Sequence, residues 1–278
     1  MSKNPPNLAD LSPATANPLA FAISESDKQI LTMVQAALST GRMRLAFQPV
    51  VLTQDSEKIA FHEGLIRILD HTGRAIPAKD FMPAVEAHEI GREIDCAALG
   101  LGLRALIENP ELRLSINMSA RSIGYQKWTR ILRSRIRSYP RLGERLILEI
   151  TESSAMAMPE ITIAFMDRWQ QEGIAFAMDD FGAGYTAIRY FRDFYFDILK
   201  IDGQFIRNIH TNRDSQVITA ALLTIGKHFD MMCVAESVET IEDAECLQQL
   251  GVDCLQGYLF GAPTVNPAWM AKQNRRSA

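Results

Sequence analysis

The chain has 278 residues, of which 47% are hydrophobic and 22% charged, so it holds enough apolar material for one large domain. Its formal net charge of −4 excludes a general nucleic-acid binder that relies on a basic surface. No apolar run is long enough to span a bilayer. The four cysteines form no CxxC pair, which favours free thiols and a reducing, cytoplasmic location over a zinc site.

The two ends of the chain differ in composition from its middle. Residues 1–26 are rich in proline, asparagine, serine and alanine, which predicts a flexible N-terminal tail. From residue 27 to residue 40 the apolar residues recur at helical spacing, and Gly41 is a suitable stop. We expect one domain over residues 27–272 and a frayed C-terminus over residues 273–278.

Two strands at 44–52 and 58–69 are separated by a short polar patch, which predicts a hairpin. Helices and strands then alternate along the chain. The predicted helices lie at 81–88, 90–107, 125–139, 160–172, 214–229 and 241–250. The predicted strands lie at 112–118, 145–151, 174–179, 196–201, 231–235 and 253–260.

The later strands are short and apolar on both faces, as in RLILEIT, IAFAMDD and MMCVAES. Such strands are typical of a parallel sheet that helices cover. Repeated strand–helix units without a GxGxxG turn favour a closed barrel over an open dinucleotide-binding sheet. The sequence therefore predicts an α/β fold of the (β/α)8 barrel type, with the opening hairpin as a departure from the simplest form.

Nearly every predicted strand ends at its carboxyl side in a residue that can bind a cation or form a hydrogen bond. In a barrel these ends meet on one face, where active sites lie. A single such carboxylate is usually a helix cap or a surface charge. Glu149 is different because it interrupts the apolar strand LILEIT, where an unpaired carboxylate is costly. The set comprises Glu63, Asn117, Glu149, Glu152, Asp179, Asp180, Lys200, Asp202, Glu236, Glu239 and Gln256.

Carboxylates gathered on one face repel one another, and they stay ionised only when cations compensate them. A ligand set made only of oxygens, from carboxylates and a side-chain amide, favours Mg²⁺ or Mn²⁺ over zinc. The adjacent Asp179 and Asp180 allow one carboxylate to bridge two metal ions. Two ions suit the in-line attack of water at phosphorus.

Eight segments in this order resemble the EAL-type phosphodiesterases, which hydrolyse cyclic di-GMP. They lie between about residue 44 and residue 263 and read FQPVV, EGLIR, INMS, LEITES, MDDFGAGY, DILKID, VAESVET and LQGYLFGAP. The resemblance implies a modified (β/α)8 TIM-like barrel with an antiparallel strand near its start, which agrees with the predicted hairpin. It also implies hydrolysis of cyclic di-GMP to linear pGpG in bacterial second-messenger signalling.

The resemblance further implies a metal site and a catalytic set. Two ions of Mg²⁺ or Mn²⁺ would be held by Glu63, Asn117, Glu149, Asp179, Asp180 and Glu236. Ca²⁺ is expected to inhibit, since its looser coordination suits in-line geometry poorly. The catalytic residues would be Glu63, Lys200, which orients the attacking water, and Glu236, which acts as a ligand or general base.

Six more residues receive roles from the resemblance. Glu152 would hold the DFGAGY loop in place. The dinucleotide would be bound by Gln48, Arg67, Asp202, Glu239 and Gln256. The expected partners are therefore cyclic di-GMP and a second copy in a homodimer, with no nucleic-acid polymer and no membrane insertion.

Several residues depart from the family pattern. Gly64 stands for an alanine, Ala183 for a threonine, Thr186 and Ala187 for a serine pair, and Ser237 for a glycine. If that glycine has a positive φ, the serine is strained and shifts Glu236. Because every metal ligand is present, an active enzyme is the leading hypothesis. A cyclic di-GMP receptor with weak or no hydrolysis, and a protein-interaction scaffold, are the alternatives.

Two other segments allow more than one interpretation. The basic segment 127–141 predicts a solvated amphipathic helix of the barrel, or a face for a membrane or an acidic partner. The aromatic residues Phe191, Phe194, Tyr195 and Phe196 predict core packing, or a contact in an oligomer.

Overall fold

The structure is a computed structural model that describes residues 18–183 and 192–270, with side chains from residue 25 onward. It begins with a long antiparallel hairpin of β1 (Met43–Leu52) and β2 (Asp55–Leu69), in which Gln48 faces Glu63. β1 also pairs antiparallel with the last strand, β9 (Cys254–Gln256). The predicted hairpin is thus confirmed, and β1 is the strand that runs against its barrel neighbours.

Five parallel strands complete the barrel between β2 and β9. They are β4 (Leu114–Asn117), β5 (Leu146–Thr151), β6 (Ala175–Phe181), β7 (Ile198–Ile201) and β8 (Met232–Ala235). The sheet order is β1-β9-β8-β7-β6-β5-β4-β2-β3, and the β1–β2 pairing closes it. The short β3 (Ala75–Pro77) adds to β2 outside the barrel. The predicted modified (β/α)8 barrel is confirmed.

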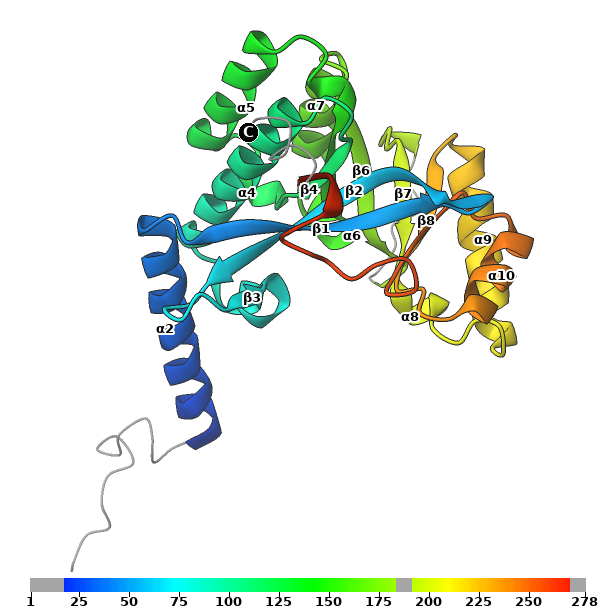
Figure 1. Ribbon diagram of the computed structural model, residues 1–278, viewed down its shortest axis with the longest axis horizontal. Helices are drawn as coiled ribbons and strands as arrows, with labels where there is room; N and C mark the ends of the chain where they lie inside the picture. Colours follow the sequence, from blue (N-terminus) through cyan, green and yellow to red (C-terminus); the bar gives the residue numbers. More distant parts are fainter. Residues whose placement is uncertain (1–17, 184–191, 271–278) are drawn as a thin grey trace, which may run out of the picture.

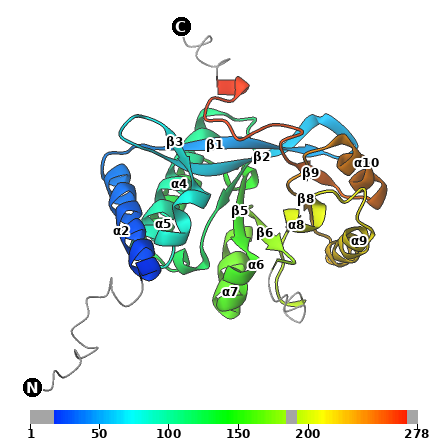
Figure 2. The same ribbon diagram turned by 90° about the horizontal axis from the view of Figure 1, so that it is seen from below.

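Helices lie around the strands (Figures 1 and 2). The long ones are α2 (Pro18–Ser39), α4 (Glu89–Glu108), α5 (Gln126–Ser138), α7 (Pro159–Gln170), α9 (Arg213–His228) and α10 (Ile241–Leu250). The short ones are α3 (Met82–Val85), α6 (Glu152–Ala157) and α8 (Gly203–Ile206), with 3-10 turns at Ala78–Asp80, Ala120–Ser122 and Gly143–Arg145. Within the described part of the chain, none of these helices has the length and apolar character needed to cross a membrane.

The first described helix starts inside the segment 1–26 that composition predicted as a flexible tail. Residues 18–26 belong to helix α2, which begins at Pro18, and not to a flexible tail over 1–26. Proline is well suited to the first turn of a helix, where its missing N–H would have no partner. The proline content of the first 26 residues therefore includes Pro18, which begins a helix. Residues 1–17 and 273–278 lie outside the described part of the chain.

Other predicted elements are shorter in the structure. The last strand ends at Gln256 and not at residue 260. The chain turns away at Gly257, where an added Cβ would lie only 1.9 Å from the Val238 carbonyl oxygen. The predicted helix over 81–88 is reduced to α3, because His88 is already extended at the start of α4. The sequence pattern did not reveal the short helices α6 and α8.

The buried apolar residues form two separate clusters. The larger lies between the barrel and its helices and includes Leu148, Phe176 and Leu199. The smaller lies inside the barrel and comprises Val50, Phe61, Ile147, Ala177, Ile198, Val234 and Cys254. Because side chains alternate along a strand, the residues two positions further on point into the same interior. That next layer is the candidate site.

Candidate active site

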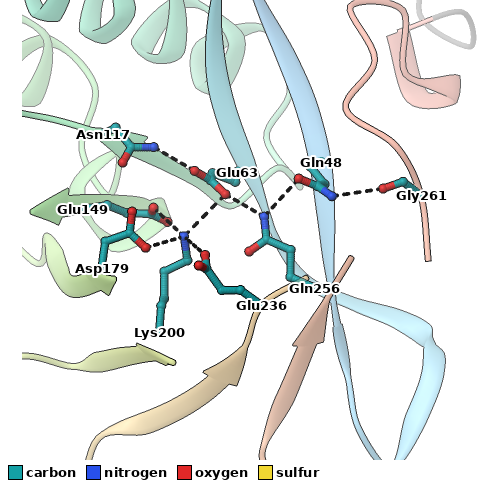
Figure 3. A network of polar contacts seen from close by, with 9 residues as sticks. All are labelled: Gln48, Glu63, Asn117, Glu149, Asp179, Lys200, Glu236, Gln256 and Gly261. Carbon is teal, nitrogen blue, oxygen red and sulfur yellow. Dashed lines mark hydrogen bonds and ion pairs between the residues drawn. The ribbon is translucent and has the colours of Figure 1, made fainter. Parts of the chain in front are cut away.

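Lys200 stands at the centre of the site and is completely buried on β7 (Figure 3). Its Nζ lies near carboxylate oxygens from four other strands or strand ends. The distances are 2.7 Å to Glu236 Oε1, 2.8 Å to Glu149 Oε2, 3.0 Å to Asp179 Oδ1 and 3.4 Å to Glu63 Oε2. The structure thus brings four of the carboxylates that the sequence placed at strand ends together around Lys200.

One ammonium group does not neutralise four carboxylates. Burial acts to lower the pKa of Lys200, but the surrounding carboxylates outweigh it and hold that pKa well above its usual value. Burial raises the pKa of Glu149 well above its usual value, and the charge of Glu63 adds to this, while Lys200 opposes it. The cluster therefore needs further positive charge, from protons or from cations.

Glu63 is held by two amide side chains on the other side of the cluster. Asn117 Nδ2 donates to Glu63 Oε1 at 2.7 Å, and Gln256 Nε2 donates to Glu63 Oε2 at 2.6 Å. Gln256 also donates to Gln48 Oε1, and Gln48 donates to the Gly261 carbonyl oxygen. Burial acts to raise the pKa of Glu63, but the Lys200 charge and these hydrogen bonds bring it below its ordinary value.

Asp179, Asp180 and Glu236 form a group whose ligand atoms lie within 4.8 Å of one another, close enough to hold a metal ion. Asp179 is buried at the end of β6, whereas Asp180 is exposed and has a positive φ of 56°. Such a conformation is uncommon outside glycine, and strained residues of this kind cluster at functional sites. Partial burial and the charge of Asp179 raise the pKa of Asp180 to about 6.

The residues present fit a hard divalent cation. The group is made of oxygen donors only, which Mg²⁺ and Mn²⁺ prefer. Burial raises the pKa of Glu236 to about 8, with Asp179 and Glu63 adding to the effect of burial and Lys200 opposing it. Glu149 Oε1 is buried and has no hydrogen-bond partner among the described residues. Buried oxygens without partners are costly, and a bound cation would satisfy them.

Glu152, to which the resemblance gives the role of holding the DFGAGY loop, contacts the start of that loop just after β6. It is buried at the start of α6, and its Oε2 accepts a hydrogen bond from the Gly182 N–H at 3.1 Å. Gly182 has a positive φ of 91°, and an added Cβ would lie 2.8 Å from the ring of Phe205. Ala183 is exposed beside it, and Thr186 and Ala187 lie outside the described residues.

A cavity of about 590 Å³ opens beside the carboxylate cluster. Four of the residues predicted to bind the dinucleotide line it: Gln48, Arg67, Glu239 and Gln256. Asp202 does not line it. Its side chain instead caps helix α8 by accepting a hydrogen bond from the Gln204 N–H at 2.7 Å. An aspartate that follows a strand and precedes a helix turn is a suitable helix cap, and its contact with the dinucleotide stays a prediction.

Among the residues that line this cavity, three with polar side chains were not singled out from the sequence: Lys79, Arg207 and Tyr258. Lys79 and Arg207 are exposed, and the side chain of Tyr258 is 66% exposed. Sequence reasoning missed them because each lies in a connection and not at a strand end. Their only signal was position, since Arg207 follows DILKID and Tyr258 lies within LQGYLFGAP.

Comparison with known proteins agrees with this geometry. The family model of the EAL domain matches residues 31–263. The chain is 30% identical over 238 residues to the cyclic di-GMP phosphodiesterase PdeF of Escherichia coli, covering 84% of this chain and 32% of PdeF. It is 28% identical over 234 residues to the cyclic di-GMP phosphodiesterase PdeB of Shewanella oneidensis, covering 83% of this chain and 27% of PdeB. The chain therefore spans about a third of the length of these curated relatives.

Solved structures show the same fold. The phosphodiesterase domain of MucR in complex with cyclic di-GMP superposes with a TM-score of 0.77 at 27% identity, covering 87% of this chain and 99% of that one. An EAL domain protein of Listeria monocytogenes gives a TM-score of 0.75 at 27% identity, covering 89% of this chain and 98% of that one. The matched residues include every strand of the barrel and the whole carboxylate cluster. The chain belongs to the EAL domain family.

Proposed function

We propose that this chain is a metal-dependent phosphodiesterase that hydrolyses cyclic di-GMP to linear pGpG. The observation that carries the proposal is the buried cluster of four carboxylates around Lys200, complete and within 3.4 Å of its Nζ. The relatives PdeF and PdeB are named cyclic di-GMP phosphodiesterases, and the MucR structure holds that nucleotide. We carry that substrate over to the cavity beside the cluster.

Glu63, Asn117, Glu149, Asp179, Asp180 and Glu236 would hold divalent cations, which would supply Lewis acidity at the phosphodiester and lower the pKa of the attacking water so that it can lose its proton. The chain's own groups have three tasks in this proposal. Lys200 Nζ orients the attacking water by hydrogen bonding, and Glu236 takes its proton. Arg67 and the amides of Gln48 and Gln256 orient the nucleotide in the cavity. The buried setting of the cluster strengthens each electrostatic contact.

A receptor that binds cyclic di-GMP without hydrolysing it is the second candidate. Ser237 favours it, because this residue follows Glu236 directly and has a positive φ of 57°. The strain expected from the sequence is therefore present next to a residue of the cluster. The same assay distinguishes the two functions, since a receptor binds the nucleotide but releases no product.

The test is product analysis of cyclic di-GMP with the purified chain in Mg²⁺, Mn²⁺ and Ca²⁺. We expect linear pGpG with the first two ions and none with Ca²⁺. Glu63→Ala should lower the rate at least 1,000-fold, on the scale of losing a central group of an active site. Glu57→Ala is the matched control, because Glu57 lies on the same strand but is exposed and outside the cavity. Binding without turnover in either metal would reject the enzyme in favour of the receptor.

A further inference from the structure

Ser237 has a strained backbone with a positive φ, and its side chain forms a specific hydrogen bond. Its Oγ accepts a hydrogen bond from Arg207 Nη2 at 3.3 Å. Ser237 lies in the connection after β8, and Arg207 ends helix α8 after β7, so the bond links two neighbouring strand ends. A glycine at position 237 would have no strain at φ 57° but would offer no hydroxyl to Arg207.

Gly203 creates the space for this pair. An added Cβ at Gly203 would lie 2.4 Å from Ser237 Oγ and 2.6 Å from Ser237 Cβ, closer than such atoms can approach. It would also lie 3.5 Å from Arg207 Nη2, so the guanidinium group lies over this glycine. Gly203, Arg207 and Ser237 therefore form one arrangement in which the glycine makes room and the serine fixes the arginine.

The arrangement faces the cavity beside the carboxylate cluster. Arg207, Ser237 and Glu239 all line it, on the side where the chain leaves β8. An arginine offers only hydrogen-bond donors, whereas a glutamate offers only acceptors. Guanine presents complementary groups: O6 and N7 accept, and the ring N–H and the amino group donate. A phosphate would complement Arg207 but would be repelled by Glu239.

We propose that Arg207, positioned by Ser237, contacts the O6 and N7 acceptors of one guanine of cyclic di-GMP, while Glu239 accepts from the donor edge of the same base. This inference rests on the proposed function and adds a base-specific contact to it. Arg207 touches the nucleotide, and Ser237 acts through Arg207. Such a pair of hydrogen bonds from arginine to guanine is the commonest specific contact to that base in nucleic acids.

The first test compares cyclic di-GMP with its 7-deazaguanine analogue, which lacks only the N7 acceptor. We expect Arg207→Ala to raise KM for cyclic di-GMP about tenfold with little change in kcat. The wild-type chain should prefer cyclic di-GMP over the analogue severalfold, and the variant should show no preference. If the preference survives in Arg207→Ala, the arginine does not contact the base edge and the assignment is wrong.

The second test separates positioning from packing. Ser237→Gly relieves the strained backbone, so Tm should rise by about 2 °C, while KM should rise roughly threefold through the loss of the bond to Arg207. A purely structural serine would give the rise in Tm with KM unchanged, which would overturn its positioning role. Arg135→Ala is the matched control, because Arg135 is exposed on α5 away from the cavity and should leave KM unchanged.

The outcome remains interpretable if the chain proves to be a receptor. Dissociation constants for the two nucleotides, measured by calorimetry in Ca²⁺, replace the KM values. The preference for cyclic di-GMP should again disappear in Arg207→Ala. If the wild type hydrolyses neither nucleotide but still binds cyclic di-GMP more tightly than the analogue, the proposed enzyme activity is rejected and the proposed base contact is supported. Equal affinity of the wild type for both nucleotides would reject the base contact alone.

Discussion

The barrel interior has two layers of side chains that lie only two residues apart along the strands. The lower layer is apolar except for the buried Ser115 on β4, and the layer directly above it holds the charged and amide groups of the site. The steps from lower to upper layer are Phe61 to Glu63, Ile147 to Glu149, Ala177 to Asp179, Ile198 to Lys200, Val234 to Glu236 and Cys254 to Gln256. On the antiparallel β1 the step is reversed, from Val50 to Gln48.

The comparison shows how one framework supports opposite kinds of interior. Both layers are held by the same ladder of strands, so their difference lies in the side chains alone. The lower layer gains stability from apolar burial. The upper layer lowers stability, because it buries carboxylate oxygens that have too few partners, such as Glu149 Oε1. Such a layer needs protons or cations to balance its charge, and this need makes it a candidate cation site.

Removing Lys200 should have the largest effect. In Lys200→Met the four carboxylates lose their shared ammonium group, and breaking a buried ion pair costs about 3–5 kcal/mol. We expect Tm in EDTA to fall by roughly 10 °C and to recover in part when Mn²⁺ is added. Calorimetry with and without metal checks this. A variant as stable as the wild type in EDTA would show that the upper layer needs no cation.

A cavity in the lower layer should lower stability without altering the site. Ile198 lies two residues before Lys200 and is buried, so Ile198→Ala should cost roughly 3–4 kcal/mol through lost packing. The affinity of the folded chain for Mn²⁺ should change less than twofold. Urea unfolding gives the first quantity and titration calorimetry gives the second. A large loss of metal affinity would mean that the two layers are not independent.

Asp95 tests what happens to a buried carboxylate without a nearby cation. It accepts from the Ser119 N–H at 3.0 Å and the Ser122 hydroxyl at 2.6 Å, and burial raises its pKa from 3.8 to about 6 in spite of these bonds. The folded state therefore holds its proton more tightly than the unfolded state. Stability from this group is fully present below pH 4 and is lost as the pH rises to about 6.

Asp95→Asn removes that titration and keeps an acceptor for both donors. Relative to the variant, the wild type should lose about 2–3 kcal/mol of unfolding free energy between pH 4 and pH 7. Chemical unfolding of both proteins across this range is the measurement. Parallel stability curves for the two proteins would refute a protonated Asp95.

We expect the smallest effect from a substitution at Gly64, which lies on the outer face of the barrel strands. An added Cβ would lie 2.7 Å from Ile116 Cδ1, which also lies 2.7 Å from the Cβ position of Gly102. Gly64→Ala, the family's usual residue, should therefore cost about 1–2 kcal/mol by overpacking. Ile116→Val removes the crowded methyl group, so the alanine should be less harmful in that background. Equal losses in both backgrounds would contradict this packing account.

Much of the fold could be predicted from the sequence, because strand alternation and apolar runs carry most of it. The hairpin, the parallel strands and the polar strand ends follow from local patterns, and the carboxyl ends of barrel strands converge by geometry. Composition alone did not reveal that helix α2 begins at Pro18, because a proline at a helix start is also typical of a tail. A local pattern also could not reveal that Asp202 caps helix α8, and its contact with the nucleotide remains a prediction.

The rest depended on contacts between distant segments. The bond between Arg207 and Ser237 joins residues thirty positions apart, and neither alone indicates it. The apolar run after Gln256 resembles a strand, yet the backbone turns at Gly257 because Val238 crosses it. The homodimer expected from the family remains a prediction, as do the roles of the individual site residues.

Binding of Mn²⁺ to the wild-type chain and to Asp179→Asn tests the central claim most directly. The asparagine keeps the shape of the buried residue but removes one charge from the cluster around Lys200. Titration calorimetry should show binding to the wild type and to the exposed-surface control Asp193→Asn, with affinity reduced more than tenfold in Asp179→Asn. Identical isotherms for all three proteins, or no binding to any, would contradict a cation site in the upper layer of the barrel.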